Sequence, residues 1–150
     1  MEEFLMKAAF LLGRLVFGGF FIYNGINHLK ERKSMGQYAQ SKNVPLGEFA
    51  VAATGVALIG GGASILLGVK PRAGAAAIAG FLAGVSPVMH DFWRIEDPTQ
   101  RMNEMINFGK NVALLGSALT LLGLEEPWPA SVPVGRKEFE AEDYEDLAVA

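Results

Sequence analysis

Four apolar segments constrain this chain more than any other feature of its sequence. They cover residues 5–28, 46–68, 73–93 and 104–124, and each is close to the roughly 20 residues that cross the hydrocarbon core of a bilayer. Hydrophobic residues make up 51% of the 150 residues and charged residues 19%, whereas a soluble domain carries about 25% charged residues. Too little polar surface remains for a soluble bundle. We therefore predict an all-α fold, a four-transmembrane-helix bundle, over residues 1–124.

The stretches between these segments are suited to connecting helices. Residues 29–45 form a long polar connection, and the sequence VKPR at residues 69–72 indicates a tight turn within a helical hairpin. Residues 125–150 contain eight acidic and two basic side chains. Such an excess of one charge is typical of solvated chain without a packed core. We therefore predict an acidic, flexible tail over residues 125–150.

The cysteine content limits the possible chemistry, and the distribution of basic residues bears on the membrane topology. The chain has no cysteine, which excludes disulfides, thiol catalysis and thiolate metal sites. The first apolar segment is too long for the apolar part of a cleaved signal peptide, so we expect it to be retained as a span. Six basic residues lie on the side of the first and third connections and five on the other side. This difference slightly favours a cell-membrane topology with both termini outside.

Small residues spaced four apart mark candidate packing faces on two of the predicted helices. This spacing lets helix backbones approach closely in lipid. The alternative is that glycine is simply common in membrane helices. The predicted packing positions are Gly60, Ser64 and Gly68 on the second segment and Gly80 and Gly84 on the third.

A stripe with polar members runs along the first segment. Steps of four, three, four and three residues place it on one helical face, and its members are Arg14, Gly18, Phe21, Gly25 and His28. Arg14 lies roughly 13 Å from the start of the segment, near mid-bilayer. A lone charge at that depth costs at least about 2.5–3.5 kcal/mol. We therefore expect a partner or a water-lined cavity for Arg14, and Asn24 adds a polar group beside His28.

Polar groups also enter the third and fourth segments. His90 and Asp91 stand near the end of the third, and histidine is the side chain whose charge changes near neutral pH. Lys110 lies roughly 9 Å from the start of the fourth segment, beside Asn111. Its ammonium could snorkel to the nearby membrane surface. Alternatively, it could face inward with Asn111 and complete a polar pocket.

Counting the crossings places His28, His90 and Lys110 toward the same membrane side, and these are the only two histidines. Three interpretations stay open. The histidines could ligate haem or another metal, but two ligands without acidic support are a weak pattern, and we predict no metal site. The pocket could bind a quinone, whose carbonyl oxygens need donors such as histidine, lysine or asparagine. The third interpretation is that these groups only hydrogen-bond the helices together.

Several motifs together resemble the DoxX family of small four-helix membrane proteins. The resemblance covers residues 8–124 and rests on GRLVFGGFFIYNGINHL, LIGGGASILLGVKPRAGA, MHDFWRIEDPTQR and the pattern F-x-KN-x-ALLG. Many relatives carry a glutamate in the second helix, where this chain has Leu58. The resemblance implies a four-helix membrane fold. It also links the chain with redox-enzyme complexes such as thiosulfate:quinone oxidoreductase, or with protein maturation and cargo handling.

The favoured function is a redox-linked, quinone-interacting subunit of a membrane oxidoreductase system. His28 and His90 would contact the quinone carbonyls or exchange protons. The head group would be positioned by Lys110, Asn111 and Asn24, with Asp91 completing the pocket. No residue is assigned as catalytic, a quinone is the favoured cofactor, and haem is less favoured.

Two other function classes stay open. One is a non-catalytic membrane partner or assembly factor, and the other is a small-solute or proton pathway lined by Arg14 and Lys110. The expected partners are the lipid bilayer, a soluble or membrane redox protein, and a second copy of the chain. Nucleic acid is not expected.

Overall fold

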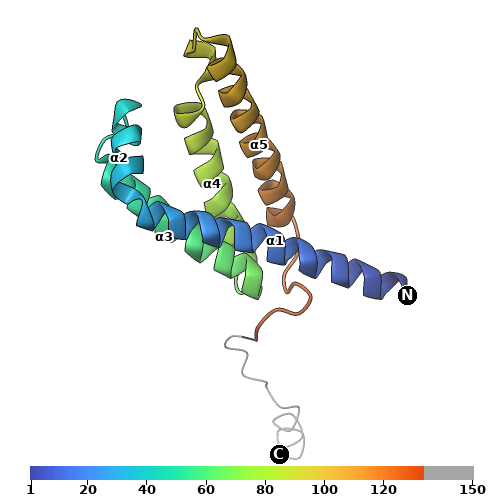
Figure 1. The fold of residues 1–150 in the computed structure, drawn as a ribbon. Helices are drawn as coiled ribbons and strands as arrows, with labels where there is room; N and C mark the ends of the chain where they lie inside the picture. Colours follow the sequence, from blue (N-terminus) through green and yellow to red (C-terminus); the bar gives the residue numbers. More distant parts are fainter. Residues whose placement is uncertain (134–150) are drawn as a thin grey trace, which may run out of the picture.

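The computed structural model describes residues 1–133 and contains five α-helices and one 3₁₀ turn within that range (Figure 1). Four of these helices are long and apolar enough to cross a membrane. The prediction of an all-α, four-transmembrane-helix bundle is therefore confirmed. The elements are α1 (Glu2–Lys30), α2 (Arg32–Ser41), α3 (Gly47–Leu67), α4 (Pro71–Met89), η1 (Phe92–Arg94) and α5 (Pro98–Leu122).

Local sequence signals explain where the helices begin and end. The helix α3 ends at Gly68, whose φ of 70° is a left-handed conformation that glycine adopts without a side-chain clash. Pro71 then occupies the first turn of α4, where a backbone N–H is not needed. At α5, the Asp97 carboxylate accepts a 2.7 Å hydrogen bond from the Gln100 N–H. This cap starts α5 at Pro98, well before the predicted residue 104.

Paired glycines bring α1 and α3 into close contact. A β-carbon added at Gly18 would lie 2.7 Å from the Gly62 carbonyl oxygen, and one added at Gly25 would lie 2.6 Å from the Gly55 carbonyl oxygen. Side chains larger than hydrogen are therefore excluded at this crossing unless the helices move apart. Gly18 and Gly25 belong to the stripe predicted on the first segment, so this stripe is the face that α1 turns toward α3.

The packing positions predicted from four-residue spacing are only partly those that the fold uses. Gly60, Gly80 and Gly84 are exposed, and a β-carbon added at any of them would meet no atom within 4 Å. The prediction fails at these three positions within the single chain. Spacing shows that small residues share a face, but not which face meets the neighbouring helix. Ser64 and Gly68 do lie at close contacts, Ser64 with Gly74 of α4, and Gly68 with Ser131 and with Arg14 of α1.

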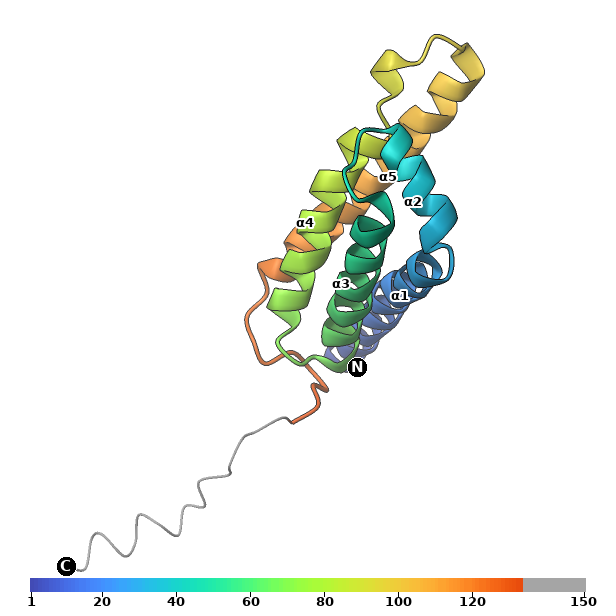
Figure 2. The ribbon, with the colours of Figure 1, turned by 90° about the vertical axis from the view of Figure 1, so that its left-hand side faces the viewer.

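The long helices pack in chain order around an apolar core. The pairs are α1 with α3, α3 with α4, and α4 with α5, whereas α1 and α5 form no comparable pair in the described chain. Figure 1 shows α1 crossing the lower part of the α4–α5 hairpin, and Figure 2 shows α2 beside the upper end of α3. Leu58, which stands where the resembling family often has a glutamate, is fully buried in the core.

The chain after α5 folds back onto the bundle. Trp128 is only 3% exposed, and its ring centroid lies 5.4 Å from that of Phe10. The Val132 N–H donates a 2.9 Å hydrogen bond to the Leu67 carbonyl oxygen. These contacts place residues 125–133 in the folded unit, so the predicted boundary at residue 124 lies too early. The rest of the predicted tail, residues 134–150, lies outside the described part of the chain.

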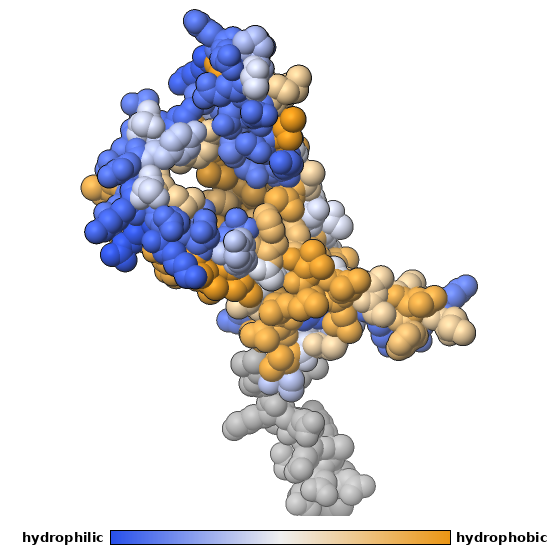
Figure 3. Space-filling view, in the orientation of Figure 1, coloured by the Kyte–Doolittle hydropathy of each residue, from blue (hydrophilic) through white to orange (hydrophobic). Residues whose placement is uncertain are grey.

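The surface separates into an apolar and a polar part. In the view of Figure 3, hydrophobic side chains cover much of the long helices, while hydrophilic ones gather over α2 and around η1. A soluble protein would place polar groups over all of these faces. Long apolar helices with outward apolar faces are those of a multi-pass protein whose solvent is the lipid bilayer.

Candidate functional site

Polar side chains from different elements meet at the end of the bundle that carries α2 and η1. The Lys42 ammonium, just after α2, lies 2.5 Å from the Asp91 carboxylate, just after α4. This ion pair joins the first and third connections. The hydrogen bond to Asp91 raises the pKa of Lys42 above its usual value, so the ammonium stays charged at neutral pH. Asp91 was singled out from the sequence, whereas its partner Lys42 was not.

A second polar pair stands between α4 and α5. The Nδ1 atom of His90 lies 2.7 Å from a carboxylate oxygen of Glu104, and both side chains are partly buried. Glu104 was missed from the sequence because α5 was expected to begin only there. The available signal was its helical spacing of three, four and seven residues from Asn107, Phe108 and Asn111, which share its partly buried face.

Three aromatic rings lie beside this pair. The ring of Phe92 is 5.1 Å from that of Trp93 and 5.6 Å from that of Phe108, and all meet edge to face. Trp93 is 51% exposed. His90 precedes η1, which carries two of these rings, and Glu104 stands one helical turn before Phe108 on α5. Together Phe92, Trp93 and Phe108 form an aromatic shelf next to the hydrogen-bonded His90–Glu104 pair.

His28 takes a different partner. Its Nδ1 atom lies 3.1 Å from the Thr54 hydroxyl oxygen, and its ring meets Phe81 at 5.8 Å. The Thr54 hydroxyl already donates to the Val51 carbonyl oxygen, so it accepts a hydrogen bond from the Nδ1–H of His28. Phe81 lies nine residues before His90, about 13 Å along α4. The two histidines are therefore held at separate places.

The histidines form no metal centre in the described part of the chain. No group of three or more histidine, cysteine, aspartate or glutamate side chains there could hold a metal ion. His90 has acidic support from Glu104, which was not anticipated, but His28 pairs with a hydroxyl group. The arrangement consequently gives no support to haem or metal ligation by both imidazoles.

The remaining predicted pocket residues do not converge on one point. Lys110 is exposed on α5, about 18 Å along the helix from Pro98. Asn24 donates a 2.8 Å hydrogen bond to the Phe20 carbonyl oxygen of its own helix. Asn111 is partly buried on the face of α5 that packs against α4. Of these three, only Asn111 lies on the same face as Glu104.

Arg14 occupies a separate, buried site. Its guanidinium donates from Nε to the Ile65 carbonyl oxygen over 3.0 Å, from Nη2 to that of Leu66 over 2.9 Å, and from Nη1 to that of Pro129 over 2.5 Å. The rings of Phe10 and Trp128 flank it, each 5.8 Å away. The partner that we expected for Arg14 is therefore the C-terminal end of α3, whose free carbonyl oxygens carry partial negative charge.

The partners of Arg14 show where it lies along the bundle. Arg14 contacts the last residues of α3 and the segment after α5, so it lies near one end of the packed helices rather than at their middle. The first turns of α1 project beyond the other helices (Figure 1), and this overhang was not visible from hydropathy. All three guanidinium nitrogens are occupied by backbone oxygens, which favours a structural role over a solute pathway.

Comparison with known families agrees with this architecture. The sequence profile of the DoxX family matches residues 9–91, more than half of the chain. The chain belongs to the DoxX family. Neither the curated proteins nor the solved structures gave a significant match to it.

The DoxX match begins at residue 9 within α1, continues through α4 and ends at Asp91. It therefore includes Arg14, His28 and His90, but not α5, which supplies Glu104. Glu104 orients the His90 imidazole through Nδ1, which leaves Nε2 as the atom available to a ligand. This DoxX-family protein thus presents an oriented imidazole beside an aromatic shelf at one end of its bundle.

Proposed function

We propose that this DoxX-family protein is a redox-linked subunit that binds a quinone at the α4–α5 end of its bundle. The supporting observation is the His90–Glu104 pair, 2.7 Å apart, beside the aromatic shelf formed by Phe92, Trp93 and Phe108. In this proposal the protein lies in the cell membrane, and the end that carries α2 faces the cytoplasm. The basic residues of the first connection support that orientation.

The chemistry of a quinone head group suits this arrangement. Its carbonyl oxygens accept hydrogen bonds, its ring packs against aromatic side chains, and its tail is apolar. The Glu104 carboxylate accepts a hydrogen bond from the Nδ1–H of His90, and the Nε2–H of a protonated imidazole can donate to a quinone carbonyl. Reduction to the quinol takes up two electrons and two protons. In the proposal, a partner oxidoreductase supplies the two electrons and His90 passes one proton to a carbonyl oxygen. The aqueous phase supplies the second proton and reprotonates the imidazole.

Tryptophan fluorescence tests this proposal directly. The chain has two tryptophans: Trp93 lies on the shelf, and Trp128 lies beside Arg14 at the opposite end. We expect decyl-ubiquinone to quench the fluorescence of the detergent-purified full chain, with the signal retained in Trp128→Phe and lost in Trp93→Phe. His90→Ala should weaken binding about tenfold, the value of one charge-assisted hydrogen bond.

His28→Ala is the matched control, because it removes the other histidine without touching the shelf. Equal weakening by His28→Ala and His90→Ala would contradict the assignment of the site. Saturable quenching of Trp128 alone would place the quinone at the other end of the bundle.

A non-catalytic membrane partner or assembly factor is a second candidate function. It is favoured by Lys110, an exposed ammonium within the membrane-spanning helix α5 that has no hydrogen bond or ion pair among the described residues. A partner helix with a carboxylate would neutralise it. Blue native electrophoresis of membrane extracts tests this idea, since Lys110→Leu should shift the protein to a smaller species. Identical migration of both proteins would count against it.

A further inference from the structure

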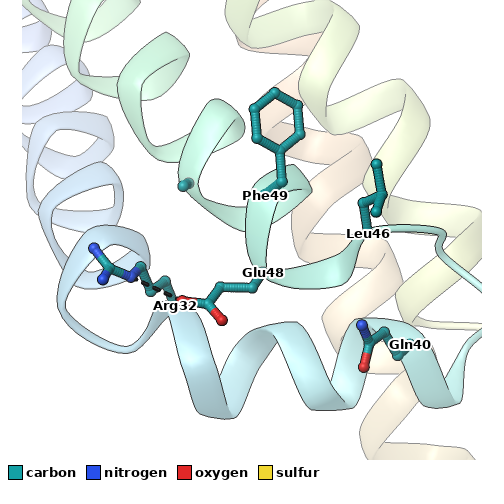
Figure 4. Close-up of a pocket in the computed structure, with 6 residues that line it drawn as sticks. Arg32, Gln40, Leu46, Glu48 and Phe49 are labelled. Atoms are coloured by element: carbon teal, nitrogen blue, oxygen red, sulfur yellow. Dashed lines mark hydrogen bonds and ion pairs between the residues drawn. The ribbon is translucent and has the colours of Figure 1, made fainter.

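We propose that the corner between α2 and α3 binds one anionic phospholipid, with Arg32 holding its phosphate. A hollow of about 480 Å³ lies at this corner (Figure 4). Its lining combines an ion pair and an amide with apolar side chains. The lining residues are Arg32, Gln40, Leu46, Glu48, Phe49 and Ala52. This site is separate from the α4–α5 end and does not depend on quinone binding.

The hollow lies where the membrane surface is expected. The membrane-spanning part of α3 begins at Gly47, and the polar helix α2 covers that end of it. Leu46 and Phe49 are 74% and 71% exposed. Apolar side chains so exposed at the start of a span face the acyl chains, whereas the adjacent α2 faces the headgroups. The hollow therefore opens across the boundary that a phospholipid itself crosses.

The charges around the hollow select an anion. Residues 30–48 contain four basic side chains and two acidic ones, and one of the two acids is Glu48 in the lining. A second hollow, of about 410 Å³, shares Arg32 and is also lined by Lys30 and Lys33. Basic clusters at the end of a membrane helix attract anionic lipid headgroups.

Arg32 has donors to spare for a phosphate. Its Nε atom donates a 3.0 Å hydrogen bond to Glu48, and both side chains are about half exposed. This is its only hydrogen bond to the described residues, so the two terminal nitrogens of the guanidinium are left free. An exposed ion pair contributes little to stability, and a guanidinium binds phosphate in a bidentate manner. A phosphate can therefore bind beside Glu48 or replace it.

Close backbone packing holds the hollow in shape. A β-carbon added at Gly36 of α2 would lie 2.7 Å from the Glu48 backbone, so α2 lies directly against the first turn of α3. Leu46, between the two helices, has a φ of 50°, a left-handed conformation that is costly for a branched side chain. The fold keeps this conformation while exposing the Leu46 side chain at the hollow. Such strain is often found at ligand sites.

A phospholipid fits this site better than a free phosphate. Three of the six lining residues are apolar, and two of these, Leu46 and Phe49, are exposed. Inorganic phosphate would leave this apolar surface uncovered. An acyl chain on Leu46 and Phe49 would cover that surface while the phosphate reaches Arg32. Both halves of the hollow are then used by one amphiphile.

Native mass spectrometry of the detergent-purified full chain tests the proposal. The probes are dioleoyl phosphatidylglycerol, which is anionic, and dioleoyl phosphatidylcholine, which is zwitterionic. We expect the first phosphatidylglycerol to bind at least about fivefold more tightly than phosphatidylcholine, the value of about one basic residue near an anionic surface. Arg32→Gln should remove this preference. Glu48→Gln should strengthen phosphatidylglycerol binding, because it frees Arg32, and misfolding cannot produce such a gain.

Arg101→Gln is the matched control, because it removes one exposed basic residue from the same membrane side, on α5. It should leave the preference unchanged. Equal loss in Arg101→Gln and Arg32→Gln would overturn the proposal in favour of diffuse charge attraction. An unchanged or weakened affinity in Glu48→Gln would overturn the role of Arg32. Displacement of phosphatidylglycerol by millimolar inorganic phosphate would overturn the choice of a lipid.

Discussion

Charged side chains at the two ends of the bundle have different kinds of partner. At one end, Arg14 is 3% exposed and donates to three backbone carbonyl oxygens. At the other end, His90 and Lys42 are partly exposed and pair with side-chain carboxylates. A guanidinium whose nitrogens all donate to backbone carbonyl oxygens holds the helices together. In an accessible side-chain pair, a ligand can replace one of the two partners. The comparison therefore indicates a structural role for the Arg14 end and a binding role for the end that carries His90.

Replacement of Arg14 should produce the largest effect. Arg14→Leu leaves the carbonyl oxygens of Ile65, Leu66 and Pro129 without their donor in a buried site. We expect a loss of about 3 kcal/mol or more in the free energy of unfolding, since each hydrogen bond to a charged group contributes about 1.5–3 kcal/mol. Thermal unfolding of the detergent-purified chain measures it. A variant as stable as the wild type would break the comparison between the two ends.

The second-largest loss of stability is expected where α1 and α3 pack closely near Arg14. A β-carbon added at Gly62 would lie 2.6 Å from the Gly18 carbonyl oxygen, so Gly62→Ala should destabilise the protein by about 2 kcal/mol through overpacking. Gly60→Ala is the control two residues earlier on α3, where nothing lies within 4 Å. There the better helix propensity of alanine should stabilise by up to about 1 kcal/mol. The same thermal unfolding assay compares them, and equal changes would contradict the assigned faces of α3.

Glu104→Gln sharpens the contrast at the other end. The amide keeps a hydrogen bond to His90 but removes the negative charge beside the imidazole, so the bond is no longer charge-assisted. We expect decyl-ubiquinone affinity to fall about tenfold while the melting temperature changes little. Trp93 fluorescence quenching and thermal unfolding give the two readouts. A large loss of stability without loss of affinity would make this end structural as well.

The Lys42–Asp91 ion pair should give the smallest effect. Lys42→Ala should cost about 1 kcal/mol, because the pair is only partly desolvated. The pKa of Lys42 is raised in the folded state, so the contribution of the pair is complete below the ordinary lysine pKa of about 10.4. It is lost as the pH rises through the higher folded-state value. Chemical denaturation between pH 7 and 11 should therefore show wild type and Lys42→Ala converging only at the alkaline end.

Some of the candidate site was accessible from the sequence, and some was not. The stripe of α1 was predicted by its three- and four-residue spacing, and four of its five members are buried. Lys42 and Glu104 escaped notice, since each meets a residue far along the chain whose position depends on how the helices cross. The contact of Trp128 with Phe10 was equally hidden, because prolines end a helix without showing where the chain goes next.

The sequence by itself determined the membrane spans, the helical class and the DoxX relationship. These depend on the length and composition of contiguous segments, since lipid forces each apolar stretch to satisfy its backbone hydrogen bonds within one helix. Only the tertiary structure decided that Gly62 rather than Gly60 faces α1, and that His28 and His90 bind different partners. A periodic pattern fixes a face of a helix, but its neighbour is chosen by packing among all the helices at once.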